Sequence, residues 1–182
     1  NATNGNGNTT RPVSLTVGGP TSDVKVVDTS VSASAGSVVV PIQLISRGTE
    51  NALGFSLVFD PSVLTYLSAA PGTDAGGATL NPNASQVASG KLGIVLALPA
   101  GQVFSTGAKA VALVTFNIVP TPTNPTQVSF GDQPIVKEIA DASANTLAAT
   151  WTSGSVTFDT CTGYEGDAAP KPNGNEILTT AD

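Results

Sequence analysis

The chain of 182 residues contains no histidine, no methionine and a single cysteine. The absence of histidine excludes Ser-His-Asp and Cys-His catalytic arrangements and removes a common ligand of zinc sites. One cysteine cannot form a disulfide within the chain, so Cys161 either meets a partner chain or stays a free thiol. No GxGxxG or P-loop pattern is present either. These absences predict a protein that is not an enzyme.

Charged residues are also scarce, at 11% of the chain, and their balance is acidic. Seven Lys and Arg against thirteen Asp and Glu give a net charge of −6, whereas nucleic-acid binding needs clustered basic residues. No apolar run approaches the roughly 20 residues that a membrane span requires. A surface rich in Ser, Thr and Asn is common outside the cell, so we expect a secreted or cell-surface location. The acidity serves either solubility or calcium binding.

Paired carboxylates are the remaining candidates for catalytic chemistry. Asp132 with Glu138 or Asp141, and Asp23 with Asp28, could form such pairs. No cluster of aromatic residues accompanies them to bind a sugar ring. We therefore interpret these residues as solvated acids in turns.

The sequence offers two further kinds of contact with sugars. Trp151, Tyr66 and Tyr164 are the candidates for a stacking platform, although Trp151 could instead pack in the core or at a sheet edge. Asn8 and Asn83 each begin a glycosylation sequon. Such triplets also arise by chance in a chain rich in Asn, Ser and Thr.

Short alternating apolar segments separated by turn residues predict an all-β fold. With 19 Gly and 13 Pro, turns are frequent, and no long amphipathic pattern of helical period is present. The pattern is typical of an antiparallel two-sheet sandwich of about nine strands. Pro41 predicts an edge or a bulge in its strand, and we expect 71–90 to form a long loop. The expected strands are 24–32, 37–45, 53–59, 63–69, 92–98, 110–119, 127–130, 135–139 and 155–158. The expected core residues are Val39, Leu57, Phe59, Leu64, Val95, Leu113, Phe116 and Phe158.

Composition divides the chain into an extension at 1–20, a sandwich at 21–159 and a tail at 160–182. In the extension, Val13, Leu15 and Val17 alternate with polar residues, which predicts an extra strand with one apolar face. Gly18 to Pro20 separate this strand from the rest. We expect it to bind a sheet edge, either of its own sandwich or of a neighbouring subunit, and the second case would give a filament.

The sandwich segment resembles a cohesin module. Four stretches carry the resemblance: 36–44, which reads GSVVVPIQL; 53–64, which reads LGFSLVFDPSVL; 93–96, which reads GIVL; and 112–118, which reads ALVTFNI. The resemblance implies a nine-stranded jelly-roll sandwich that binds calcium-loaded dockerins through one sheet face. It therefore implies a non-catalytic module for protein–protein assembly or adhesion. The alternative is a carbohydrate-binding module of a secreted polysaccharide-degrading system, because similar sandwiches occur there.

The tail resembles the start of a dockerin-type calcium repeat. Asn173, Asn175 and Asp182 have the spacing of the third, fifth and twelfth positions of such a loop, where oxygen ligands are required. Asp167 becomes the first ligand only with an insertion of four residues before Asn173. Glu176 stands where the sharp turn of the loop favours Gly. The tail is thus either a calcium site, with calcium as the cofactor, or a solvated acidic segment.

Overall fold

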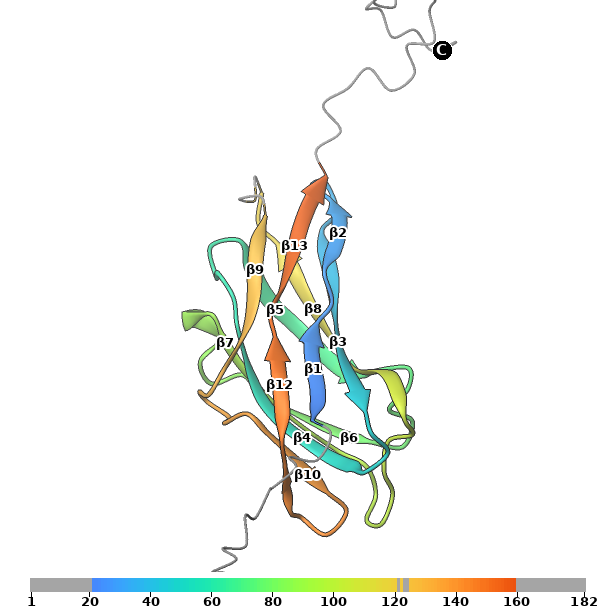
Figure 1. The fold of residues 1–182 in the computed structure, drawn as a ribbon. Helices are drawn as coiled ribbons and strands as arrows, with labels where there is room; N and C mark the ends of the chain where they lie inside the picture. Colours follow the sequence, from blue (N-terminus) through green and yellow to red (C-terminus); the bar gives the residue numbers. More distant parts are fainter. Residues whose placement is uncertain (1–20, 121, 123–124, 160–182) are drawn as a thin grey trace, which may run out of the picture.

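The computed structural model describes residues 21–120, 122 and 125–159, and these form two facing β-sheets (Figure 1). Besides strands, the described part contains one short 3-10 turn, Val87–Ser89. This confirms the predicted all-β sandwich. The predictions for Asn8, Val13, Leu15 and Val17, and those for the tail, lie outside the described residues. The strands are β1 (Ser22–Val26), β2 (Thr29–Ser32), β3 (Ser37–Ser46), β4 (Glu50–Val58), β5 (Leu64–Pro71), β6 (Thr79–Asn83), β7 (Lys91–Ala97), β8 (Gly107–Ile118), β9 (Thr126–Gly131), β10 (Glu138–Asp141), β11 (Thr146–Leu147), β12 (Ala149–Thr152) and β13 (Gly154–Asp159).

The first sheet has the strand order β12-β1-β3-β8-β5. In the second sheet β4 is central: β7 pairs along one side of it, and β10 and then β9 pair along the other. β6 lies outside β7, β11 lies beside β10, and β13 and β2 continue from β9. β6 corrects the expected loop at 71–90. Its Pro82 is tolerated because β6 is an edge strand.

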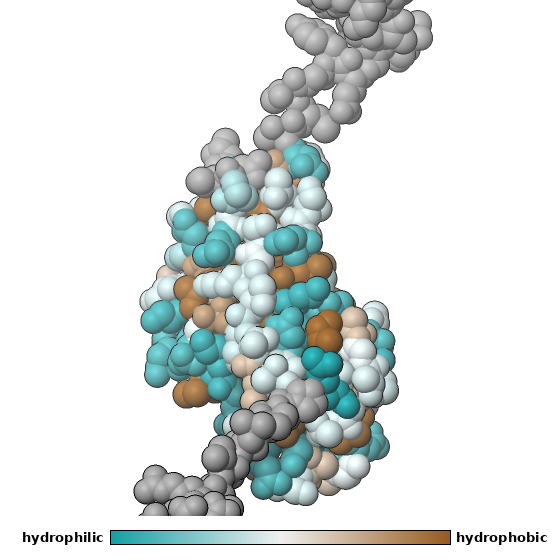
Figure 2. Space-filling model, viewed as in Figure 1, coloured by the Kyte–Doolittle hydropathy of each residue, from teal (hydrophilic) through white to brown (hydrophobic). Residues whose placement is uncertain are grey.

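Two chain segments change sheets together. The expected strand 24–32 is in fact β1 in the first sheet followed by β2 in the second, and β12 and β13 make the same crossing beside them. These two pairings are parallel, whereas the other described pairings are antiparallel. The Asp28 carboxylate accepts the Ser155 backbone N–H at 2.8 Å where both segments cross. Figure 2 shows that this side of the sandwich carries mostly polar and pale residues with small separate apolar patches.

Pro41 marks the point where β1 leaves the first sheet. β3 is an interior strand, so of the two alternatives predicted from Pro41 the edge position is wrong, whereas a bulge against β8 is present next to it, at Ile42 and Gln43. The Val27 N–H donates to the Pro41 carbonyl at 3.0 Å, but Pro41 has no N–H with which to complete the pair. The Val27 carbonyl accepts the Thr29 hydroxyl instead, at 3.1 Å. The missing donor thus ends the β1–β3 ladder where the chain turns to the second sheet.

The core lies between the two sheets and corrects three of the expected core residues. Leu57, Phe59, Leu64, Phe116 and Phe158 are buried as predicted. Val39 and Val95 are instead 45% and 39% exposed, because they point outward from β3 and β7, and Leu113 is only half-buried on the outer side of β8. Each of these three lies in a run that is apolar on both faces, so period-two alternation cannot assign the inward face.

Substitution of Phe116 and of Leu113, which lie on opposite faces of β8, separates the contributions of the two faces. We expect Phe116→Ala to lower the free energy of unfolding by about 3–5 kcal/mol, since it empties a buried site. Leu113→Ala should lower it by about 1 kcal/mol, as is usual away from a packed core. Urea unfolding of both variants measures the difference. Equal losses would show that Leu113 is also a core residue.

A buried carboxylate anchors the start of β4. Glu50 is fully buried, and its carboxylate accepts hydrogen bonds from the Ser22 hydroxyl, the Ser46 hydroxyl at 2.7 Å and three successive backbone N–H groups. The three N–H groups belong to residues 47, 48 and 49, at 2.9–3.1 Å. Burial alone would raise the pKa of Glu50, but the hydroxyl and backbone donors outweigh it and lower the pKa from 4.5 to about 2.

Because the pKa of Glu50 is lowered on folding, the stability of the sandwich depends on pH. Because the folded pKa lies below that of the unfolded chain, the contribution of this carboxylate is complete above about pH 4.5 and is lost as the pH falls toward 2. Glu50→Gln should lower the free energy of unfolding at neutral pH by about 1.5–3 kcal/mol or more, because one hydrogen bond to a charged group contributes this amount. It should also flatten the loss of stability below pH 4.5. Urea midpoints at several pH values, with Glu138→Gln as the exposed control, test both effects; an unchanged pH dependence in Glu50→Gln would contradict the assignment.

Candidate functional site

The outer face of the second sheet is made of unusually small side chains. Neighbouring residues across the strands form two rows, Asn83–Gly93–Ser56–Gly131 and Thr79–Ala97–Ala52–Ala140. A third row between them contains Val95, Gly54 and Glu138. Because Gly, Ala and Ser project little from a sheet, other chain segments can approach the backbone closely here.

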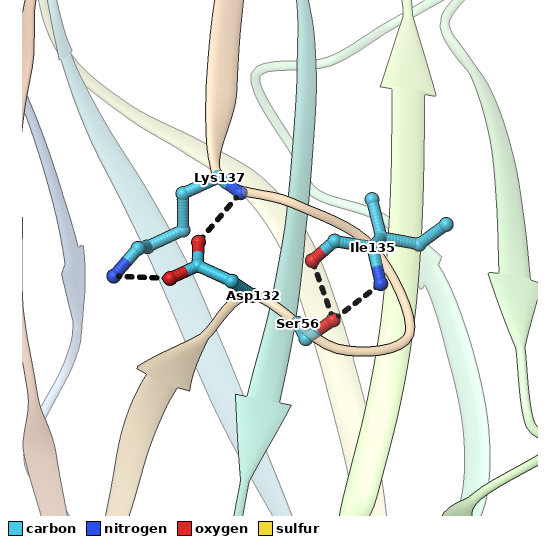
Figure 3. A network of polar contacts seen from close by, with 4 residues as sticks. All are labelled: Ser56, Asp132, Ile135 and Lys137. Carbon is cyan, nitrogen blue, oxygen red and sulfur yellow. Dashed lines mark hydrogen bonds and ion pairs between the residues drawn. The ribbon is translucent and has the colours of Figure 1, made fainter.

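One segment of the chain already lies across this face. Residues 132–137, here called the strap, connect β9 to β10, and the expected strand 135–139 is therefore a strap followed by β10. The Ile135 N–H donates to Ser56 Oγ at 2.8 Å, and the Ser56 hydroxyl donates to the Ile135 carbonyl at 2.7 Å (Figure 3). Ser56 points outward from β4 yet is fully buried. The strap thus covers the Gly–Ser row.

The two ends of the strap are joined to each other. The Asp132 carboxylate accepts the Lys137 backbone N–H at 3.1 Å and lies 3.5 Å from Lys137 Nζ (Figure 3). Both side chains are partly exposed, so this ion pair contributes little stability and chiefly fixes the shape of the strap.

Gly93 provides the space in which the strap rests. A Cβ atom at Gly93 would lie 2.6 Å from Ile135 Cγ1, closer than packed carbon atoms approach, and 3.0 Å from Pro134 Cγ, which is tighter than most such contacts. Gly54 is less restrictive, since a Cβ there would meet Ile135 Cγ2 at 3.4 Å. The glycine in the middle of the apolar strand β7 is therefore explained by the strap.

Gly93→Ala should displace the strap without changing the core. We expect faster hydrogen exchange at the Ile135 amide and a loss of about 1–3 kcal/mol, typical of overpacking. Gly36→Ala is the matched control, because a Cβ at Gly36 has no neighbour within 4 Å. Protection of Ile135 that is equal in both variants would mean that the strap does not depend on Gly93.

Beside the strap, the face contains a hollow of about 380 Å³. This volume falls within the range of ligand sites, which begins at about 300 Å³. Two of its lining residues are exposed valines, Val95 at 39% and Val136 at 62%. The only charged residue among the described lining residues is Glu138, whose Oε1 accepts the Thr146 hydroxyl at 2.6 Å. The lining residues are Ala52, Leu53, Gly54, Val95, Ile135, Val136, Glu138, Ala140 and Ala144.

The candidate carboxylate pairs serve structural roles. Asp132 closes the strap, and Asp141 accepts hydrogen bonds from the Asn145 side chain and backbone, which lower the pKa of Asp141. Asp23 accepts the Thr150 hydroxyl at 2.8 Å. Asp23 and Glu138 lie within β1 and β10, so the interpretation of these acids as residues of turns is wrong for these two.

The described aromatic residues pack inward. Trp151 lies 5.1 Å from the Phe130 ring and 6.1 Å from the Phe55 ring, edge-to-face or tilted, so the packing alternative for Trp151 is confirmed. Tyr66 is half-buried, and burial raises the pKa of its hydroxyl. No aromatic side chain in the described part of the chain is exposed. Asn83 is half-buried at the end of β6, where its Oδ1 accepts the Ser85 N–H at 3.1 Å.

Metal-binding clusters and membrane helices are absent from residues 21–120, 122 and 125–159. No three Asp, Glu, His or Cys side chains come close enough there to hold a metal ion. No helix in this part is long and apolar enough to cross a membrane. Tyr164, Cys161 and the proposed calcium ligands Asp167, Asn173, Asn175 and Asp182 lie outside the described residues.

By its fold, the protein is a two-sheet jelly-roll sandwich. Comparison with solved structures shows which known sandwiches it is similar to. The chain is similar to the seventh ScaB type I cohesin of Pseudobacteroides cellulosolvens, with a TM-score of 0.62 and 19% identity over 79% of this chain and 96% of that one. It is also similar to a non-cellulosomal cohesin of the archaeon Archaeoglobus fulgidus, with a TM-score of 0.63 and 13% identity over 78% and 93%. A third similar structure is the sixth cohesin of Acetivibrio cellulolyticus scaffoldin B in complex with a Cel5 dockerin mutant. Its TM-score is 0.60, and its sequence is 24% identical over 77% of this chain and 100% of that one. The sandwich has a cohesin-like fold.

Sequence comparison adds no closer assignment. No family model matches the chain, and no curated protein matches it. The likeness is therefore one of fold, and the residues of the hollow come from this structure alone. Ser56, Gly93 and Val136 were not expected as site residues, and the only signal for them in the sequence is a glycine interrupting an apolar strand.

Proposed function

We propose that the chain is a non-catalytic, extracellular module for protein–protein assembly, and that its recognition surface is the outer face of the second sheet. The observation that carries this proposal is the hollow beside the strap. A concave apolar surface with two exposed valines and one carboxylate is suited to a protein partner, since interface cores are apolar and poor in charge. Similar cohesins in complex with dockerins support the choice of a protein partner.

The two ends of the chain extend this proposal. The expected strand at Val13, Leu15 and Val17 would bind a neighbouring subunit and make the chain a filament subunit. Calcium would be the cofactor of the tail, held by Asp167, Asn173, Asn175 and Asp182, whose oxygens are the hard ligands that calcium prefers. These ends lie outside the described residues, so sequence spacing alone supports both parts.

Carbohydrate binding receives no support from the described surface. Sugar rings commonly stack on exposed aromatic faces, and the described aromatic residues are buried or half-buried. The hollow is lined by aliphatic and small residues. We therefore favour a protein partner.

Val95→Asp tests the recognition surface. The probes are calcium-loaded dockerins, including the Cel5 dockerin of A. cellulolyticus, titrated by calorimetry into the full chain. We expect binding of at least one dockerin to weaken by about a hundredfold or more, because a carboxylate buried without a partner costs several kcal/mol. Val39→Asp is the matched control, since Val39 is exposed to a similar degree on the other sheet.

The outcomes separate the two faces. Loss of binding in Val39→Asp with full binding in Val95→Asp would move the recognition surface to the first sheet. If no dockerin binds and the full chain also fails to self-associate, the assembly function itself is wrong. Equal urea midpoints of the two variants show that neither change acts through unfolding.

A further inference from the structure

One charged side chain lines the hollow, and no described residue places a cation beside it. Glu138 is exposed, and its carboxylate accepts only the Thr146 hydroxyl among the described groups. Lys137, its neighbour in sequence, directs its amine to Asp132 at 3.5 Å. A partner that fills the apolar hollow therefore gains a further contact if it brings a cation beside its aliphatic side chains.

Register fixes the spacing that such a partner must have. Gly54 pairs with Val95 on one side and with Glu138 on the other, so Val95 and Glu138 lie two strand spacings apart, about 9–10 Å. In an extended segment, residues two positions apart lie about 7 Å from each other on the same face. A partner segment with a cation at one position can thus place this cation beside Glu138. Its aliphatic residue two positions later then lies over Gly54, at the floor of the hollow.

One segment of this chain has that pattern. Arg11 is the only charged residue among residues 1–20, and Val13, Leu15 and Val17 follow it at intervals of two. In an extended conformation these four side chains share one face. The segment thus offers a guanidinium for Glu138 and aliphatic groups for the hollow.

The length of the linker favours a second copy as the source of this segment. The Thr21 carbonyl accepts a hydrogen bond from Arg47 Nε at 3.1 Å, beside the first sheet, where β1 begins. The four steps from Val17 to Thr21 span at most about 14 Å. The Ser22 N–H donates to the Ala148 carbonyl at 3.1 Å, and Ala148 follows β11 of the second sheet, so the linker ends at the edge where the two sheets meet. A chain that used its own segment would have to turn around this edge between residues 17 and 21, whereas a segment from a second copy meets no such restriction.

We propose that the hollow of one copy binds residues 11–17 of a second copy, with Arg11 at Glu138 and the aliphatic residues against Val95 and Val136. This inference rests on the proposed assembly function and names the partner of the same face. Donor and acceptor are different surfaces of the same chain, so the contact is head-to-tail and continues from copy to copy. The acceptor is a sheet face beside the strap, in place of the sheet edge that the sequence suggested.

Two full-chain variants with complementary defects test the inference. Leu15→Asp damages the donor segment and Val95→Asp damages the acceptor. By sedimentation velocity, the native chain should form a series of oligomers that grows with concentration, whereas each variant alone should stay monomeric. An equimolar mixture should give a dimer and nothing larger, because only one intact donor and one intact acceptor remain for each pair. Val39→Asp is the control and should assemble like the native chain.

A charge exchange tests the ion pair separately. Arg11→Glu should raise the dissociation constant by about tenfold or more, and the double variant Arg11→Glu, Glu138→Arg should restore it. Native chain that stays monomeric at all concentrations, a mixture that forms no dimer, or equal loss in Val39→Asp would each overturn the inference. A dockerin that still binds in a Val95-dependent manner would then show that the proposed function stands without self-assembly.

Discussion

The buried carboxylate of Glu50 is the contact on which the geometry of the second sheet depends. It accepts donors from the start of β1, the end of β3 and the turn between β3 and β4, so it fixes three chain segments around the first residue of the central strand. Its own backbone carbonyl also accepts the Phe104 N–H at 2.8 Å. Because β4 pairs with both β7 and β10, the position of Glu50 sets the walls of the hollow.

The outer face of that sheet is partly covered by the strap and partly open to a binding partner. Small residues weaken a sheet, since they pack little surface, and this one has Gly54, Gly93 and Gly131 on a single face. The strap compensates by burying Ser56 and placing Ile135 over Gly93. It covers only part of the face, and the uncovered remainder is the hollow. The strap thus forms one wall of the candidate site, and the sheet forms its floor.

The sequence predicts the sandwich well where its alternation is unambiguous. Leu57 is buried as expected, because Gly54 and Ser56 separate the inward positions of β4, and Phe59 continues the alternation directly after the strand. Val39 lies between two other valines, so either face could be inward, and the prediction was wrong. The site could not be predicted, because the hollow joins β4, β7, β10 and the strap, whose register is set by tertiary pairing. Only the glycine in β7 signalled a close approach of another segment.

The two faces of the sandwich differ in what they leave open to a partner. The outer side of the first sheet exposes Val39, which is 45% exposed. On the second sheet, Val95, Val136 and Glu138 surround a concavity with a fixed spacing between its apolar floor and its charge. Shape and charge together select a partner more strongly than an exposed apolar side chain alone. The second sheet is therefore the face on which specificity can be built, whether the partner is a dockerin or another copy of the chain.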